Sequence, residues 1–140
     1  MALRKFGRMA AAALCLGATV AAQAAWRPVP GAPDLDIELG SMQAEHSLVA
    51  VWVRSWGRHA LLPDLATHGA RPPRIQRTAL RLEFDCSRRT MRVLAANAYA
   101  TTGAPAFMTS TPGPVLPVTG DDLGWAYDAV CEAARSDRRL

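Results

Sequence analysis

The clearest pattern in the chain is the alternation of apolar and polar residues over residues 78–86. Such alternation predicts a β-strand with one buried face and one solvent-exposed face. A short polar connection follows, and residues 91–100 then continue as a second strand, so the two segments predict an antiparallel hairpin. The side chains expected to point inward are Leu80, Leu82, Phe84 and Cys86 in the first strand and Met91, Val93, Ala95 and Tyr99 in the second.

Further strands are predicted on both sides of this hairpin. Residues 26–33 hold three prolines and predict an extended entry, residues 34–40 a short first strand, and residues 41–45 a polar turn. Residues 46–56 are apolar on both faces, which indicates a central strand covered on both sides. Residues 57–77 lack a clear period and predict a long loop, with a short helical turn at 61–66. A weaker strand is expected at 106–109. The two faces of the central strand are Val49, Val51 and Val53 against Leu48, Ala50 and Trp52.

The C-terminal segment predicts one amphipathic helix. Asp121 or Asp122 suits its N-cap, and arginines lie near its C-terminal end. Apolar residues recur at helical spacing along a single stripe. The whole pattern predicts an α+β fold, an antiparallel sheet of about five to six strands with this helix packed on one face. The stripe consists of Leu123, Tyr127, Val130, Cys131 and Ala134.

The first 24 residues have the pattern of a cleavable signal peptide. Three basic residues precede an apolar run over residues 9–22, which is too short to span a bilayer as a stable helix. A small-x-small motif then places cleavage between Ala24 and Ala25, which leaves a single domain over residues 25–140. Cys15 offers an alternative, lipid attachment after cleavage before it, but the bulky Leu14 makes a poor lipobox.

Removal of this segment changes the charge of the chain. It carries three of the 16 basic residues and none of the 12 acidic ones, so the formal charge falls from +4 to +1. The basic balance of the whole chain therefore does not indicate a nucleic-acid-binding protein. We expect an exported protein of the periplasm or cell surface, with no transmembrane segment after cleavage.

Two cysteines remain after residue 24, Cys86 and Cys131. An even count in an exported chain favours a disulfide, and these two can pair in one way only. Because one lies on the inward face of a predicted strand and the other in the helical stripe, the bond would join the helix to the sheet.

A basic segment is the candidate binding site. It consists of Arg71, Arg74 and Arg77, in or beside the long loop, and Arg81 in the next strand. Guanidinium groups bind sulfate and carboxylate groups well. We therefore hypothesise that the segment binds an anionic partner, either a protein or an anionic polysaccharide. Solvated loop charge is the alternative. Trp56, at the end of its strand, is the aromatic candidate for partner binding.

The other two tryptophans of the predicted strands and helix have different expected positions. Trp52 is expected in the core or in a dimer seam. Trp125 lies opposite the helical stripe and is either covered by the N-terminal arm or available to a partner.

Motifs for catalysis and cofactors are absent from the sequence. His46, His59 and His68 lack the spacing of metal sites, so no metal is expected. No nucleophile elbow and no glycine-rich phosphate loop follows residue 24, so neither an enzyme nor a cofactor is expected. A small hydrolase stays a third alternative, and it would need a pocket where a histidine contacts a hydroxyl or a carboxylate.

A set of short motifs runs in order along the chain. They are Trp26, Asp36 to Ser41, Val49 to Trp52, Cys86 with Arg92, Tyr99 with Gly103, Val115 to Thr119, and Val130 with Cys131. Together they resemble the bacterial surface-adhesin E-like family of small exported proteins. This resemblance implies a sheet with the helix packed on it, a strand-to-helix disulfide and often a homodimer. It also implies adhesins that bind host extracellular-matrix or serum proteins, some of them lipoproteins. The chain departs from the family in its lipobox and in having arginine but no lysine after residue 24.

The function expected from these observations is an exported binding module without catalysis. The alternative is a periplasmic structural or envelope accessory protein that binds a bacterial partner.

Overall fold

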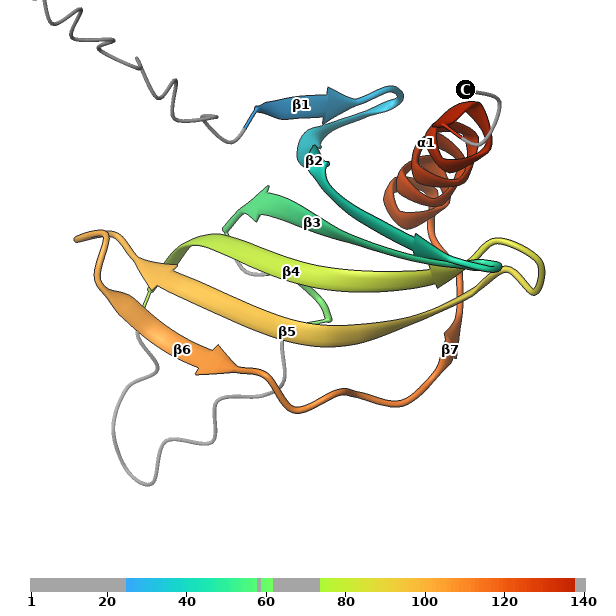
Figure 1. Cartoon of the computed structure of the whole chain (residues 1–140). Coiled ribbons are helices and arrows are strands. Elements are labelled where there is room, and N and C mark those ends of the chain that lie inside the picture. The colour runs from blue at the N-terminus through green and yellow to red at the C-terminus, as the bar shows by residue number, and fades with distance from the viewer. Residues whose placement is uncertain (1–24, 58, 62–73, 138–140) are drawn as a thin grey trace, which may run out of the picture.

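The computed structural model describes residues 25–57, 59–61 and 74–137. The signal segment, Arg71, His68 and the helical turn expected at 61–66 therefore lie wholly or largely outside the described residues. The described chain forms an antiparallel sheet with one C-terminal helix, as the sequence predicts (Figure 1).

Six strands follow one another across the sheet in chain order, each antiparallel to the next. A two-residue strand, β7, pairs with the start of β5, at Thr90 and Met91, and lies off this path. Because every neighbour in the path is also the next strand in sequence, each pair is joined by a direct connection rather than a crossover. The strands are β1 (Trp26–Val29), β2 (Ala32–Glu45), β3 (Leu48–Trp56), β4 (Ile75–Asp85), β5 (Thr90–Ala100), β6 (Pro105–Thr109) and β7 (Leu116–Pro117).

The helix α1 (Asp121–Asp137) packs against β1, β2 and β3 (Figure 1). The Asp122 side chain accepts a hydrogen bond from the Leu123 N–H at 2.8 Å, and both first-turn acids favour the positive end of the helix dipole. The expected stripe is buried except for Leu123, which is half-buried. Against it lie the inward residues of β3 and β4, with the Tyr127 ring edge-on to Phe84 at 5.9 Å.

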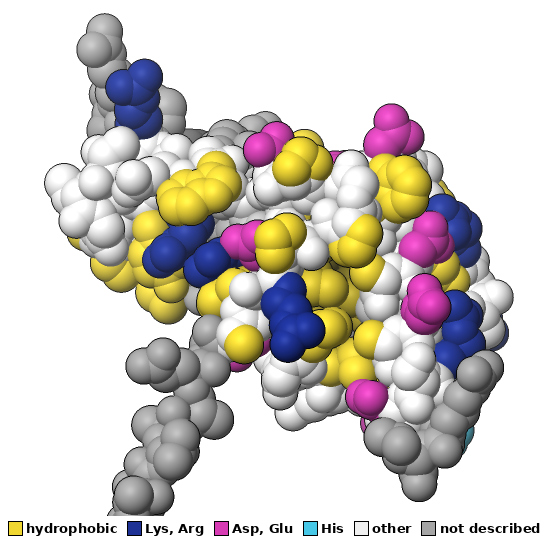
Figure 2. Space-filling model, turned by 90° about the horizontal axis from the view of Figure 1, so that it is seen from above, with side chains coloured by type: hydrophobic (Ala, Val, Ile, Leu, Met, Phe, Trp, Pro, Cys, Tyr) yellow, Lys and Arg dark blue, Asp and Glu magenta, His cyan; other side chains and the backbone are white. Residues whose placement is uncertain are grey.

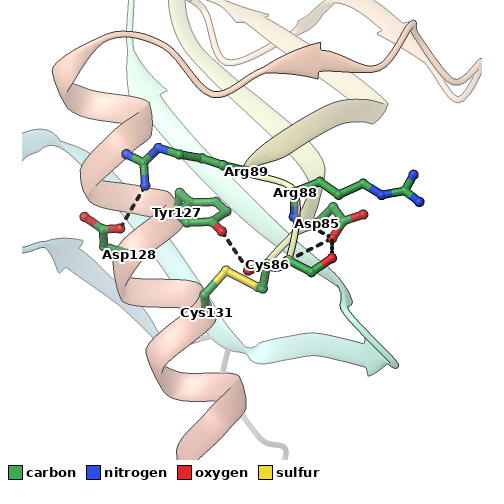
Figure 3. The surroundings of a disulfide bond; sticks show 8 residues. Asp85, Cys86, Arg88, Arg89, Tyr127, Asp128 and Cys131 are labelled. Carbon is green, nitrogen blue, oxygen red and sulfur yellow. Dashed lines mark hydrogen bonds and ion pairs between the residues drawn. A yellow bond between two sulfur atoms is a disulfide. The ribbon is translucent and has the colours of Figure 1, made fainter.

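The disulfide joins Cys86, directly after β4, to Cys131 of α1 (Figure 3). Tyr127 reinforces this junction because its hydroxyl donates to the Cys86 carbonyl at 2.9 Å. Arg89 closes over the same ring, 4.8 Å from its centroid, and reaches Asp128 at 3.5 Å. The expected pairing is confirmed, and the helix is tied to the sheet by covalent and polar contacts together.

The structure differs from the sequence prediction at the expected turn over residues 41–45 and at the N-terminal entry segment. The chain does not turn at residues 41–45, because β2 continues to Glu45 and the turn follows at 46–47. The polar stretch is an irregularity between Glu38 and Gln43, where Ser41 Oγ donates to the Glu38 carbonyl at 2.7 Å and accepts from the Trp52 N–H at 3.0 Å. The N-terminal entry is likewise a strand, β1, hairpinned onto β2.

The inward face of β5 was also predicted wrongly beyond Val93. Leu82 pairs with Val93 but Arg81 pairs with Ala95, so one extra residue lies in β5. Because side chains alternate with a period of two, this bulge turns Ala96 and Ala98 inward and not Ala95 and Tyr99.

The central strand β3 is covered on one side only by the helix. Val49, Val51 and Val53 are fully buried as expected. On the other side Ala50 is buried as expected, but Leu48 is exposed and Trp52 is half-buried, so this side is covered only in part and the expectation of full cover was wrong. That second side is a surface of the molecule.

Candidate binding surfaces

We call the side of the sheet turned away from α1 the open face. Its side chains alternate with the buried residues of β2, β3, β4 and β5, and they include both aromatic rings and arginines. Figure 2 shows the molecule from above the view of Figure 1, and basic, acidic and hydrophobic side chains are interleaved on the surface seen from there. The open-face residues discussed below are Trp26, Asp36, Trp52, Arg54, Trp56, Arg77, Arg81 and Tyr99.

Arg54 occupies the middle of β3 on this face. Its guanidinium forms an ion pair with Asp36 of β2 at 2.9 Å and lies 4.6 Å from the ring centroid of Trp26. A partly desolvated cation over an indole face is attracted by the ring quadrupole. Arg54 therefore links β1, β2 and β3 across the open face.

Two arginines of β4 also lie over aromatic rings of neighbouring strands. Arg81 lies opposite Trp52 in the strand register, 5.9 Å from its ring centroid, and donates to Gln43 at 2.8 Å. Arg77 lies opposite Trp56 and 4.9 Å from the ring centroid of Tyr99. Three arginine–aromatic contacts thus follow one another across the open face, from Trp26 of β1 to Tyr99 of β5. Trp56, at the end of β3 and opposite Arg77 in the register, lies beside this row with 63% of its surface exposed.

The structure therefore brings Arg77, Arg81 and Trp56 of the sequence-predicted site together. Arg74 precedes β4 and is exposed, and Arg71 lies outside the described residues. The contributions of Trp26 and Tyr99 were missed, because they follow from strand register and not from spacing within one strand. The alternation of Trp52, Arg54 and Trp56 along β3 was the available signal.

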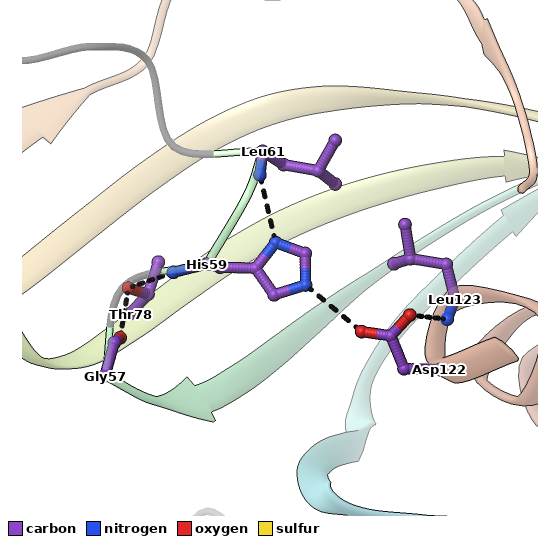
Figure 4. Close-up of polar contacts among 6 residues, drawn as sticks. All are labelled: Gly57, His59, Leu61, Thr78, Asp122 and Leu123. Carbon is purple, nitrogen blue, oxygen red and sulfur yellow. Dashed lines mark hydrogen bonds and ion pairs between the residues drawn. The ribbon is translucent and has the colours of Figure 1, made fainter. Parts of the chain in front are cut away.

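A cleft of about 670 Å³ lies where the start of β2, the end of β3 and the first turn of α1 meet. His59 is buried in its wall, and burial lowers the pKa of its imidazole, an effect that the Asp122 carboxylate partly opposes. Figure 4 shows the ring directed at Asp122, with Nε2 3.7 Å from the nearer oxygen. The residues lining the cleft that matter below are Asp34, Ser55, Trp56, His59, Asp121 and Asp122.

The hydrogen bonds of His59 assign its protonation. Nδ1 accepts from the Leu61 N–H at 3.1 Å, which places the proton of the neutral ring on Nε2, toward Asp122. The His59 N–H donates to Thr78 Oγ1, which in turn donates to the Gly57 carbonyl at 2.8 Å. In this tautomer both ring nitrogens are engaged, so the ring joins β3 to the helix and offers no free lone pair as a base.

The remaining candidates occupy other places. His46 adopts a positive φ of 56° at the β2–β3 turn. Trp125 is 48% exposed and contacts the β1–β2 turn at Gly31, so the N-terminal arm covers part of it. In the described ranges, no group of three His, Cys, Asp or Glu side chains could hold a metal ion. Among the same residues, no helix is long and apolar enough to cross a membrane.

Similarity to known proteins is found in structure and not in sequence. No protein-family model and no curated protein matches the chain. Crystal form II of Haemophilus influenzae protein E matches 76% of this chain and 87% of its own, with a TM-score of 0.53 and 13% identity. Its selenomethionine form matches 76% and 85%, with a TM-score of 0.52 and 13% identity. The chain therefore has the fold of Haemophilus influenzae protein E, and the resemblance to the surface-adhesin E-like family is confirmed at the level of the fold.

Proposed function

We propose that this chain is an exported binding module that recognises a protein partner through the open face of its sheet and catalyses no reaction. One observation carries the proposal: the row of arginines and aromatic rings on that face, with the exposed Trp56 beside it. Tryptophan, tyrosine and arginine are the residues that most often supply binding energy in protein interfaces.

The chemistry of the row supports a protein partner. Two of the three stacked guanidinium groups are held in place before binding, since Arg54 pairs with Asp36 and Arg81 donates to Gln43. Preordered side chains lose less conformational freedom when a partner docks. Their remaining N–H groups suit carboxylates or sulfates, so the anionic partner expected from the sequence, a protein or a polysaccharide, stays part of the proposal.

The absence of catalysis at the cleft beside α1 is proposed from the contacts of its histidine. His59 has Nδ1 engaged by a backbone N–H and Nε2 turned toward Asp122. General-base catalysis needs a free lone pair within reach of the substrate proton. We therefore assign His59 a structural role and propose no hydrolase activity at this cleft.

The binding experiment uses the protein purified from the periplasm with its disulfide formed. Immobilised matrix proteins, serum proteins and heparin are tested against the wild type, Trp56→Ala and the double variant Arg77→Glu/Arg81→Glu. Arg135→Glu is the matched control, because this exposed arginine lies in the last turn of α1. We expect both open-face changes to weaken binding at least tenfold and the control to bind as the wild type does. Equal binding by all four proteins would remove the open face from the proposal.

Location separates the host-directed reading from the accessory one. We expect added protease to degrade the protein on intact cells if it is an adhesin of the cell surface. Protection until the outer membrane is broken would favour the periplasmic accessory protein, and a pull-down from envelope extract would then replace the matrix proteins. Sedimentation of the purified protein measures the homodimer that the family resemblance implies.

A further inference from the structure

The cleft beside His59 contains a hydroxyl that its surroundings leave unused. Ser55 lines the cleft and is only 8% exposed, and its Oγ has no hydrogen-bond partner among the described residues. The other buried polar side chains of the described chain, His59 and Thr78, are both hydrogen-bonded. A buried hydroxyl without a partner is costly, and rotation of the Ser55 side chain toward the cleft would let a ligand atom satisfy it.

The charged side chains that line the cleft are acidic. Asp34 enters from the start of β2, and Asp121 and Asp122 from the first turn of α1. Neither arginine nor lysine is among its described lining residues. The helix dipole adds about half a positive charge at this end, which is less than the two aspartates of that turn contribute. His59 is neutral near pH 7 because burial lowers its pKa, so the cleft has negative potential.

An aromatic side chain completes the lining. Trp56 lines the cleft as well as lying beside the row on the open face, and most of its surface is exposed. An indole attracts an organic cation and also covers the alkyl carbons attached to it. Leu35 and Leu61 add apolar surface next to the carboxylates. Carboxylates beside apolar and aromatic surface form a lining suited to a charged nitrogen on a carbon chain.

We propose that this cleft binds an alkylammonium group, with Asp34 and Asp121 opposite the charge, Ser55 Oγ accepting one N–H, and Trp56 covering the alkyl chain. The proposal shares Trp56 with the proposed function but does not rest on it, because the cleft lies at the helix and uses neither Arg77 nor Arg81. The same group occurs in free amines and in lysine side chains, so both sources are tested.

The experiment is an NMR titration of the protein labelled with ¹⁵N, with pentylammonium as the probe. We expect saturable shifts of the Ser55 and His59 amides and of the Trp56 indole N–H. Pentanol, of the same length and uncharged, and pentanoate, of opposite charge, serve as matched probes and are expected to leave these signals in place. A short peptide with one central lysine, acetylated and amidated at its ends, then separates the sources: binding of both probes extends the site to protein lysines, and binding of pentylammonium alone assigns it to free amines.

Variants test the residues. We expect Asp121→Asn and Ser55→Ala each to weaken pentylammonium binding about threefold or more, as loss of one exposed charge or one hydrogen bond does. Glu132→Gln, on an exposed position of the same helix outside the cleft, is the control and should leave affinity unchanged. The proposal is overturned if pentylammonium gives no saturable shift, if pentanol shifts the same signals equally, or if Asp121→Asn binds as the wild type does. Circular dichroism of each variant confirms that the fold is retained.

Discussion

Gly31 at the β1–β2 turn lies directly against the indole of Trp125 in the helix. A Cβ built on Gly31 would be 2.6 Å from Trp125 Cδ2, well inside van der Waals contact, and the residue has a φ of +84°. The turn therefore needs glycine for two separate reasons, its backbone conformation and the closeness of the ring. This contact fixes the N-terminal hairpin to the helix.

Gly31→Ala is expected to lower the free energy of unfolding by about 1–3 kcal/mol, since an L-residue is strained at this φ and its methyl group displaces the ring. Urea unfolding measures the change. In a Trp125→Ala background the same substitution should cost less, because only the backbone strain remains. An equal cost in both backgrounds would mean that the ring moves aside freely.

His59 makes stability depend on pH. Its pKa is lowered in the folded protein, whereas the unfolded imidazole titrates near 6.5. Below that pH the unfolded chain binds a proton that the folded chain does not, so the free energy of unfolding falls as the pH decreases from about 6.5, by at most about 1.4 kcal/mol per unit.

The test compares urea midpoints at pH 8 and pH 5.5. His59→Asn keeps an acceptor for the Leu61 N–H but cannot titrate, and it should lose part of the pH dependence. His46→Asn, at an exposed turn, is the control for histidine titration in general. If His59→Asn keeps the full slope of the wild type, another group is responsible.

Ser55→Ala should stabilise the fold by about 1 kcal/mol, because it removes a buried hydroxyl that has no partner among the described residues. Thr78→Val is the contrasting change. It should destabilise by about 1–3 kcal/mol, since the Gly57 carbonyl and the His59 N–H each lose a partner. Thermal or urea unfolding measures both, and a loss of stability in Ser55→Ala would indicate that its hydroxyl is already bonded.

Reduction of the disulfide should lower the free energy of unfolding by about 2–4 kcal/mol, as expected for a bond that closes a loop of 45 residues. Cys86→Ala/Cys131→Ala, unfolded without reductant, should give a similar loss. The wild type should approach this variant when dithiothreitol is added, and the variant itself should not respond. A wild type unaffected by complete reduction would contradict the prediction.

The predictions from sequence succeeded where one period held over a whole element. The alternation in β4 and the helical stripe of α1 identified the inward side chains of these two elements and the disulfide, because burial of one face imposes that period. They failed where an irregularity lay inside a strand. The extra residue in β5 and the segment held by Ser41 in β2 keep the chain extended while breaking its alternation, so one was assigned the wrong face and the other was taken as a turn.

The binding surfaces show the same limit. Arg77, Arg81 and Trp56 could be chosen from residue type, but the partners of the arginines depend on register between strands. The approach of His59 to Asp122 could not be predicted, because it joins an irregular connection to a helix end far along the chain. Contacts of that kind carry no local period.

The position of Cys131 in the last helix bears on how the chain matures. If the protein crosses the membrane from its N-terminus, as the signal segment predicts, Cys86 emerges before its partner and the inner side of the sheet waits for residues 121–137. During that interval Cys86 is a lone thiol beside uncovered apolar strands, the state in which chains aggregate or cross-link to one another. Because no third cysteine remains after residue 24, mispairing within the mature chain is excluded, and the one oxidative hazard is a covalent dimer formed before the C-terminus arrives.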